Sequence, residues 1–147
     1  MSSYVFDTEP LLAYLYDESG ADEVAELLEA VERGTATGFI SHATAVEVVY
    51  KVARLETGDP NHIEPAEEEF VVGKRDLEIF RRFGLAVETP PIETVARIKA
   101  AGGIALGDAY GAALAATKDA TFVIGADPEF AGMPTPVTLH RIREEPV

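Results

Sequence analysis

The sequence predicts an α/β domain in which a mostly parallel sheet of four to five strands is flanked by helices. The chain has 147 residues, 47% of them apolar, which is enough for a continuous core. Short apolar runs typical of strands alternate along it with helix-forming segments, as in doubly wound sheets. No repeat or low-complexity tract interrupts this alternation, so residues 1–147 are expected to form a single domain.

The expected strands are short apolar runs bounded by turn-forming residues. They comprise residues 3–6, 35–40, 85–87, 121–124 and, at the sheet edge, 137–139. Right-handed crossovers bring the carboxyl ends of parallel strands to one edge of the sheet, where ligands bind. That edge is therefore the first place to look for a functional site.

The first helix is expected to use Thr8 as its N-cap, with Pro10 in the first turn and Gly20 ending the segment. The next helix has Val24, Leu27, Leu28 and Val31 at amphipathic spacing and stops at Gly34. These four apolar positions predict the buried side of the second helix.

The third helix is expected to begin after Ser41 as N-cap and to reach about residue 57. Its predicted core face is Val46, Val49, Tyr50 and Ala53. Further helices are expected at about 70–83, 92–101 and 108–118.

The charge balance is unusual for a protein that handles nucleic acid. Twelve basic residues, only four of them lysine, face 26 acidic residues, for a formal net charge of −14. Phosphate contacts normally require a basic surface, so this composition argues against a nucleic-acid substrate unless the working medium is very salty. Molar salt shortens the Debye length to about 3 Å, and we therefore hypothesise a salt-loving (halophilic) host.

The absence of cysteine excludes disulfides, thiolate nucleophiles and cysteine-ligated zinc. The sequence shows neither a leader-like start nor an apolar window of about 20 residues, so a cytoplasmic location without membrane contact is expected.

Four acidic residues lie where a carboxylate can be aimed at the same sheet edge. Asp7 follows the first strand, Glu47 lies within the third helix, Asp108 opens an alanine-rich helix, and Asp127 follows the strand at 121–124. Carboxylates that converge in one cleft repel one another and so imply a bound cation, for which Mg²⁺ or Mn²⁺ is the natural choice. Metal-dependent phosphoryl transfer, and hence a nuclease, is the leading interpretation.

Each of these residues also has a purely structural interpretation. Asp7 suits the turn between a strand and a helix, and Asp108 suits an ordinary N-cap. Glu47 is also explained as a boundary glutamate that reaches water or pairs with Lys51 or Arg54, and Asp127 as a turn residue before proline. The joint arrangement of the four favours the functional interpretation.

The stretches VFDTEPLLAYL, ISHATAVEVVYKVAR and LGDAYGAALAATKDATFVIGADPEF, in this order, resemble the PIN domain family. More narrowly, they resemble the VapC-type ribonuclease toxins of toxin–antitoxin pairs, and the resemblance covers essentially the whole chain. It implies a PIN-like, Rossmann-like fold and an Mg²⁺- or Mn²⁺-dependent endoribonuclease. It also implies an RNA substrate, a cognate antitoxin that covers the active groove, and a homodimer.

By position, the resemblance assigns the catalytic acids to Asp7, Glu47, Asp108 and Asp127. Asp7 and Asp108 would bind the metal directly, while Glu47 and Asp127 complete or orient the shell. Two positions depart from the family pattern: Gly125 stands where a serine or threonine is frequent, and Glu9 stands where a small or hydroxylic residue is usual.

Two other classes remain open at this stage. One is a catalytically silent PIN-like module that binds a protein partner. The other is a receiver-type phosphoacceptor domain, which Asp7 and Glu9 imitate only loosely, since such domains usually need paired acids and a lysine after a late strand.

Overall fold

A five-stranded sheet forms the centre of the computed structural model, which describes residues 1–61, 64–133 and 136–145. The strand order is β3-β2-β1-β4-β5, and every neighbouring pair is parallel. The strands are β1 (Ser2–Phe6), β2 (Ala36–Ser41), β3 (Ala86–Glu88), β4 (Thr121–Ile124) and β5 (Leu139–Arg141). The predicted α/β class with a parallel sheet is confirmed, although the edge strand begins two residues later than expected.

Helices occupy the connections between these strands. They are α1 (Thr8–Tyr16), α2 (Ala21–Glu32), α3 (His42–Glu56), α4 (Glu67–Phe83), α5 (Ile92–Ala100) and α6 (Leu106–Lys118), with a 3₁₀ turn, η1, at Pro128–Gly132. Within the described ranges, no helix has the length and apolar character needed to cross a bilayer.

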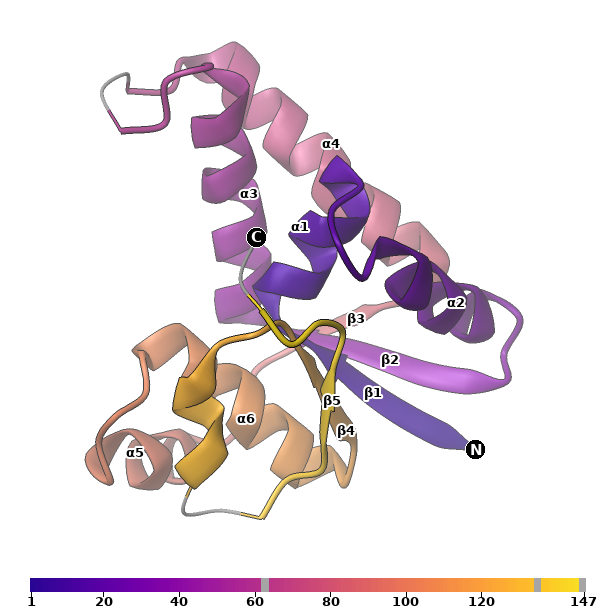
Figure 1. Ribbon diagram of the computed structural model, residues 1–147, viewed down its shortest axis with the longest axis vertical. Helices are drawn as coiled ribbons and strands as arrows, with labels where there is room; N and C mark the ends of the chain where they lie inside the picture. The colour runs from indigo at the N-terminus through magenta and orange to yellow at the C-terminus, as the bar shows by residue number, and fades with distance from the viewer. Residues whose placement is uncertain (62–63, 134–135, 146–147) are drawn as a thin grey trace.

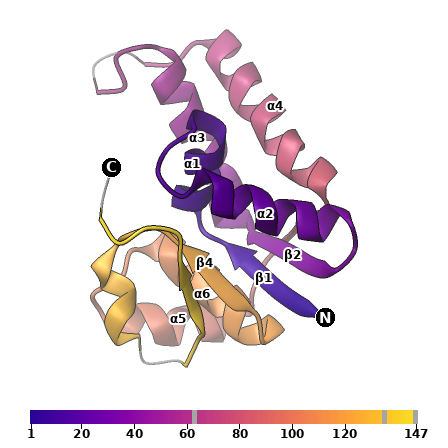
Figure 2. The same ribbon diagram turned by 45° about the vertical axis from the view of Figure 1, so that its right-hand side comes forward.

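The sheet separates two apolar cores because successive side chains of a strand point to opposite faces. Phe6 packs with α1, α2, α3 and α4 on one face, whereas its neighbour Val5 packs with α5 and α6 on the other. Figures 1 and 2 show the two groups of helices on opposite sides of the sheet.

The order of the strands reverses direction at β1, and this reversal positions the site. From β1 the chain first adds β2 and then β3 on one side, and later adds β4 and β5 on the other. Such a topological switch point opens a crevice at the carboxyl ends of the two central strands. Asp7 follows β1 directly, and the loop from Gly125 to Asp127 follows β4.

The start of α1 differs from the expected one. Thr8 is the first helical residue, and Asp7 occupies the N-cap position without a side-chain capping bond. The helix also ends early, at Tyr16, because Asp17 adopts a left-handed backbone conformation with φ 51°. Gly20 instead precedes α2 as its N-cap, so the helix predicted up to Gly20 is wrong over its last residues.

The buried face of α3 is also rotated from the predicted one. Ser41 is the N-cap as predicted, and its hydroxyl accepts a hydrogen bond from the Thr44 amide. The side chains buried along α3 are Thr44, Ala45, Val48, Val52 and Ala53, whereas Val46 is 50% exposed. Apolar residues occupy two adjacent faces of this helix, so their spacing alone did not identify the buried one.

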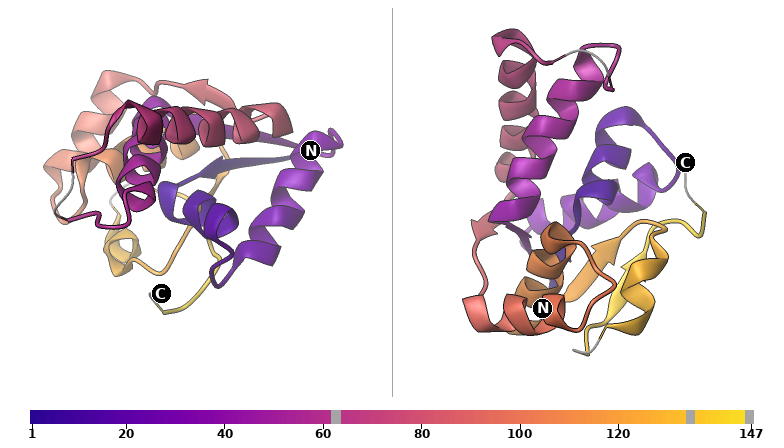
Figure 3. Two further views of the ribbon diagram at one scale, coloured as in Figure 1. Left: turned by 90° about the horizontal axis from the view of Figure 1, so that it is seen from above. Right: turned by 90° about the vertical axis from the view of Figure 1, so that its left-hand side faces the viewer.

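A close contact joins α3 to α4. A Cβ atom at Gly73 of α4 would collide with the backbone of Val49, so the missing side chain allows the two helices to approach. The right-hand view of Figure 3 shows α3 and α4 running side by side. The α3 helix therefore buries the side that lies between α1 and α4.

Candidate active site

The acidic residues gather at the carboxyl edge of the sheet, beside the switch point. Asp108, Asp127 and Glu129 form the tightest group, in which one carboxylate oxygen from each lies within 4.8 Å of the others. Asp108 comes from the first turn of α6, and the other two come from the N-terminal end of η1. Asp7 and Glu47 lie outside this trio but are close enough for their charges to raise the pKa of Asp108.

Asp7 is the most deeply buried member, with 6% of its surface exposed. Its Oδ1 atom has no hydrogen-bond partner among the described residues. Burial raises the pKa of Asp7 to about 7, and the charges of Glu47 and Glu9 add to this effect, while the Thr8 amide and Lys51 oppose it. A buried carboxylate oxygen without a partner is expensive, so its presence suggests a ligand.

Asp108 and Glu129 influence each other's pKa in opposite directions. Burial, followed by the hydrogen bond to Glu129 and the charge of Asp7, raises the pKa of Asp108 to about 9. The same hydrogen bond lowers the pKa of Glu129. Asp108 is not the N-cap of α6, because Ala105 occupies that position.

Glu47 reaches the site from α3. Its carboxylate accepts a hydrogen bond from the Thr8 hydroxyl at 3.3 Å and pairs with Lys51 at 3.4 Å. The first turn of α6 can approach because residue 107 is glycine: a Cβ there would lie 2.6 Å from Glu47 Oε1. Glu47 therefore forms the ion pair with Lys51 that the structural interpretation proposed, and it also lies at the acidic site.

Asp127 caps η1. Its Oδ1 accepts a hydrogen bond from the Glu129 amide at 2.9 Å, which agrees with its interpretation as a turn residue. The Arg141 guanidinium donates to the carbonyl oxygens of Gly125 and Asp127, at 3.3 and 2.9 Å, and so ties this loop to β5. Asp127 thus combines a structural role with a place in the acidic trio.

Sequence reasoning missed Glu129 and did not recognise the role of Glu9. The position of Glu129, two residues after Asp127 in a proline-containing turn, was the available signal. Glu9 Oε2 accepts a hydrogen bond from the Ala126 amide at 2.8 Å and pairs with Arg143 at 3.1 Å.

The two departures from the family pattern compensate for each other in space. The Glu9 carboxylate occupies the volume that a Cβ at residue 125 would need. Arg143, whose side chain is 7% exposed, also approaches Glu18 and donates to the Ser19 carbonyl oxygen. Glycine is therefore required at position 125 because a side chain there would overlap the Glu9 carboxylate, and not because of the backbone conformation.

These donors fit a divalent cation. Asp7, Asp108, Asp127 and Glu129 offer carboxylate oxygens, the ligands that Mg²⁺ and Mn²⁺ prefer. Burial and the neighbouring acids raise the pKa of Asp108, and a bound cation would oppose this shift because it favours the charged carboxylate. The unpartnered Asp7 oxygen supports the same conclusion.

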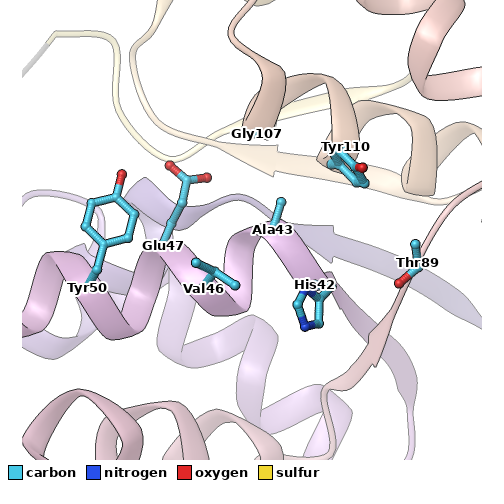
Figure 4. Close-up of a pocket in the computed structure, with 8 residues that line it drawn as sticks. All are labelled: His42, Ala43, Val46, Glu47, Tyr50, Thr89, Gly107 and Tyr110. Carbon is cyan, nitrogen blue, oxygen red and sulfur yellow. The ribbon is translucent and has the colours of Figure 1, made fainter. Parts of the chain in front are cut away.

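A pocket of about 460 Å³ adjoins the carboxylates. Figure 4 shows Glu47 and Tyr50 projecting from α3, with Tyr110 and Gly107 across from them on α6 and Thr89 at one end. Glu47 lines this pocket, and Gly107, which also lines it, immediately precedes Asp108 in α6.

Two solved structures share the fold. VapBC2 from Rickettsia felis, bound to a DNA fragment from its promoter, gives a TM-score of 0.66 at 18% identity over 95% of this chain and 98% of that one. DNA-bound VapBC from Salmonella typhimurium gives 0.65 at 16% identity over 97% and 100%. None of the curated proteins compared with the chain matches it significantly.

The family is established by the sequence as a whole. A model of the PIN domain matches residues 4–135, which include every acidic residue described above. Together with the strand order and the acidic edge, this match shows that the chain belongs to the PIN domain family.

Proposed function

We propose that this PIN domain is an Mg²⁺- or Mn²⁺-dependent endoribonuclease that hydrolyses RNA phosphodiester bonds and acts as the toxin of a toxin–antitoxin pair. The observation that carries this proposal is the convergence of acidic residues at the switch point, beside a buried Asp7 oxygen without a described partner. Membership of the PIN family, whose members are generally metal-dependent nucleases, supports the same activity.

Each acidic residue has a proposed role. Asp7 and Asp108 hold the ion directly, and Glu47 and Asp127 complete or orient the shell. The position of Glu129 within 4.8 Å of Asp108 and Asp127 adds it to the ligand set. A bound divalent ion lowers the pKa of a coordinated water and neutralises charge on phosphoryl oxygens.

The protein holds these groups in place through its own contacts. The Thr8 hydroxyl and Lys51 orient the Glu47 carboxylate, and the Glu129 amide orients Asp127. Burial of Asp7 excludes water from the inner side of the site. Such preorganised groups act more strongly than the same groups in water.

The substitution Asp7→Asn tests the assignment because it removes a charge and preserves the shape. We expect it to lower the rate of Mg²⁺- or Mn²⁺-dependent RNA cleavage, measured on denaturing gels, by at least about 100-fold. Removing a group that stabilises charge in the transition state usually has an effect of this size. Calorimetry should also show weaker Mn²⁺ binding.

Asp119→Asn is the matched control. Asp119 ends α6 with φ 51°, a conformation that asparagine tolerates, and it is exposed. This variant should cleave like the parent. An Asp7→Asn protein with full activity would end the assignment.

A catalytically silent binding module remains the alternative within the family. Calorimetry of the parent protein with Mn²⁺ separates the two, since the silent module predicts no heat of binding. The strand order β3-β2-β1-β4-β5 and the PIN match favour the nuclease and the silent module over a receiver-type domain, because the strands of a receiver sheet have a different order.

An antitoxin partner and a homodimer are proposed on separate grounds. The similar structures from Rickettsia felis and Salmonella typhimurium are VapBC complexes. In this chain, α3 and α4 leave Val46, Leu55 and Val71 exposed, and these side chains are the candidate contacts for a protein partner. Light scattering of the isolated chain tests the dimer, and co-purification with the product of the adjacent reading frame tests the antitoxin.

A further inference from the structure

The pocket beside the acidic residues has the size of a small-ligand site. Its volume of about 460 Å³ falls within the range of roughly 300–1,000 Å³ that such sites usually have. Glu47 and Gly107 line it, and the charge of Glu47 contributes to the raised pKa of Asp108, so a group bound in the pocket lies on the Asp108 side of the site. The occupant is therefore expected to belong to the same substrate molecule.

The lining does not suit a phosphate group. No lysine or arginine is among the described residues that line the pocket, and the Glu47 carboxylate would repel an anion. The lining instead combines the aromatic rings of Tyr50 and Tyr110 with the polar side chains of His42 and Thr89. A flat group with an apolar face and polar edges, such as a nucleobase, matches this chemistry.

Four cations among the described residues near the site already have partners. Lys51 pairs with Glu47, Arg143 pairs with Glu9, and Lys99 donates to the Ile104 carbonyl oxygen at 2.8 Å. Arg141 donates to the carbonyl oxygens of Gly125 and Asp127. With a net charge of −14, the protein gains little affinity from phosphates away from the metal. Contacts to bases must therefore supply much of the affinity for a nucleic acid.

Both tyrosines are held in place. Tyr110 is half-buried and packs against the core formed by α5 and α6. The Arg54 guanidinium lies over the Tyr50 ring, 4.8 Å from its centroid. A ring that is already ordered loses little entropy when a base stacks on it.

We propose that this pocket binds a nucleobase of single-stranded RNA adjacent to the phosphodiester at the acidic site, with Tyr110 as its stacking surface. This inference rests on the proposed function, because it names how the same site recognises its substrate. On this proposal, contacts to the base, and not to the charged phosphates of the RNA, supply most of the affinity outside the metal site.

The test compares two oligomers that carry the same phosphates. One is a fluorescent single-stranded RNA decamer, and the other is a decamer of equal length in which the bases are absent. Binding of each to the full chain is followed by fluorescence polarisation in Ca²⁺, and gels verify that the oligomers stay intact. The parent should bind the RNA at least about fivefold more tightly than the abasic decamer, as base stacking predicts.

Tyr110→Ala should weaken RNA binding at least about fivefold and leave binding of the abasic decamer unchanged. Tyr110→Phe is the matched control, because it keeps the ring and should bind like the parent. Mn²⁺ binding, measured by calorimetry, should be the same in all three proteins. Equal losses for both oligomers, or equal binding of both by the parent, would overturn the inference.

A second variant keeps the test decisive if Tyr110→Ala does not fold. Ala43→Leu fills the pocket from α3 and removes no packed side chain. It should reproduce the selective loss of RNA binding, and unchanged RNA binding would again reject the pocket. These outcomes are independent of cleavage by the parent protein, which tests the nuclease assignment separately.

Discussion

At the residue scale, Asp7 illustrates a conflict between function and stability. The residue is buried, has an oxygen without a described partner, and has a pKa raised to about 7, mainly by burial. A group whose pKa is higher in the folded than in the unfolded protein binds more protons when folded, so stability falls as the pH rises between the two values. For Asp7 this interval extends from 3.8 to about 7, and for Asp108 from 3.8 to about 9.

Asp7→Asn should therefore stabilise the metal-free protein at pH 8. In EDTA, we expect the midpoint of thermal unfolding to rise by at least about 3 °C at pH 8, and the gain to shrink toward pH 4. Added Mg²⁺ should raise the unfolding midpoint of the parent and have little effect on that of the variant, because a ligand stabilises only a protein that binds it. A variant that is less stable than the parent at pH 8 would contradict this account of Asp7.

Single residues also show where sequence reasoning stopped. The sequence placed Asp7 correctly after the first strand, because a strand followed by a helix start is a local signal. It assigned the capping role to Thr8, whose hydroxyl instead donates to Glu47, 39 positions along the chain. It missed Glu129, whose relation to Asp108 depends on how η1 folds back onto α6. Contacts between distant segments are not encoded in local periodicity.

At the element scale, one contact joins three parts of the fold. Glu9 of α1 accepts from the Ala126 amide after β4 and pairs with Arg143, which follows β5. Gly125 leaves the space that the Glu9 carboxylate fills. The contact fixes the loop that carries Asp127, so it links the packing of the elements to the geometry of the site.

Gly125→Ser should displace the Glu9 carboxylate and destabilise the protein by about 1–3 kcal/mol, the usual cost of overpacking. Combining it with Glu9→Ala should cost less than the sum of the single changes, by about 1 kcal/mol or more, because the collision is removed. Urea unfolding of the four proteins measures this coupling. Gly125→Ser combined with Glu78→Ala, an exposed change on α4, should be additive, and additivity in both pairs would argue against the shared space.

The ends of the helices were predicted better than the faces that they bury. The α4 helix ends at Phe83 and α3 begins after Ser41, both as predicted. The buried face of α3 was wrong because Val46 and Val49 are as apolar as the residues that are buried. The choice between the faces depends on packing against other elements, among them α4, which approaches α3 closely at Gly73. Capping is a local property, whereas the phase of an apolar helix depends on its neighbours.

At the scale of the whole molecule, acidic residues dominate the surface. The net charge is −14, and α2 alone exposes a row of acids on its outer side: Asp22, Glu23, Glu26, Glu29 and Glu32. Like charges held close together in the folded state repel one another and favour expansion. Salt shortens the range of this repulsion to about 3 Å at 1 M, and therefore stabilises the compact state.

The thermal unfolding midpoint should rise with KCl, by at least about 5 °C between 0.1 and 2 M, if charge repulsion limits stability. Replacing Glu26, Glu29 and Glu32 by glutamine lowers the repulsion without changing the buried face of α2, so this variant should depend less on salt and be more stable at 0.1 M. The comparison separates charge screening from a general effect of salt on apolar burial, which would be the same in both proteins. A parent protein whose stability does not change with KCl would reject the hypothesis of a salt-loving host, and the acidic surface would then require another explanation, such as a basic partner.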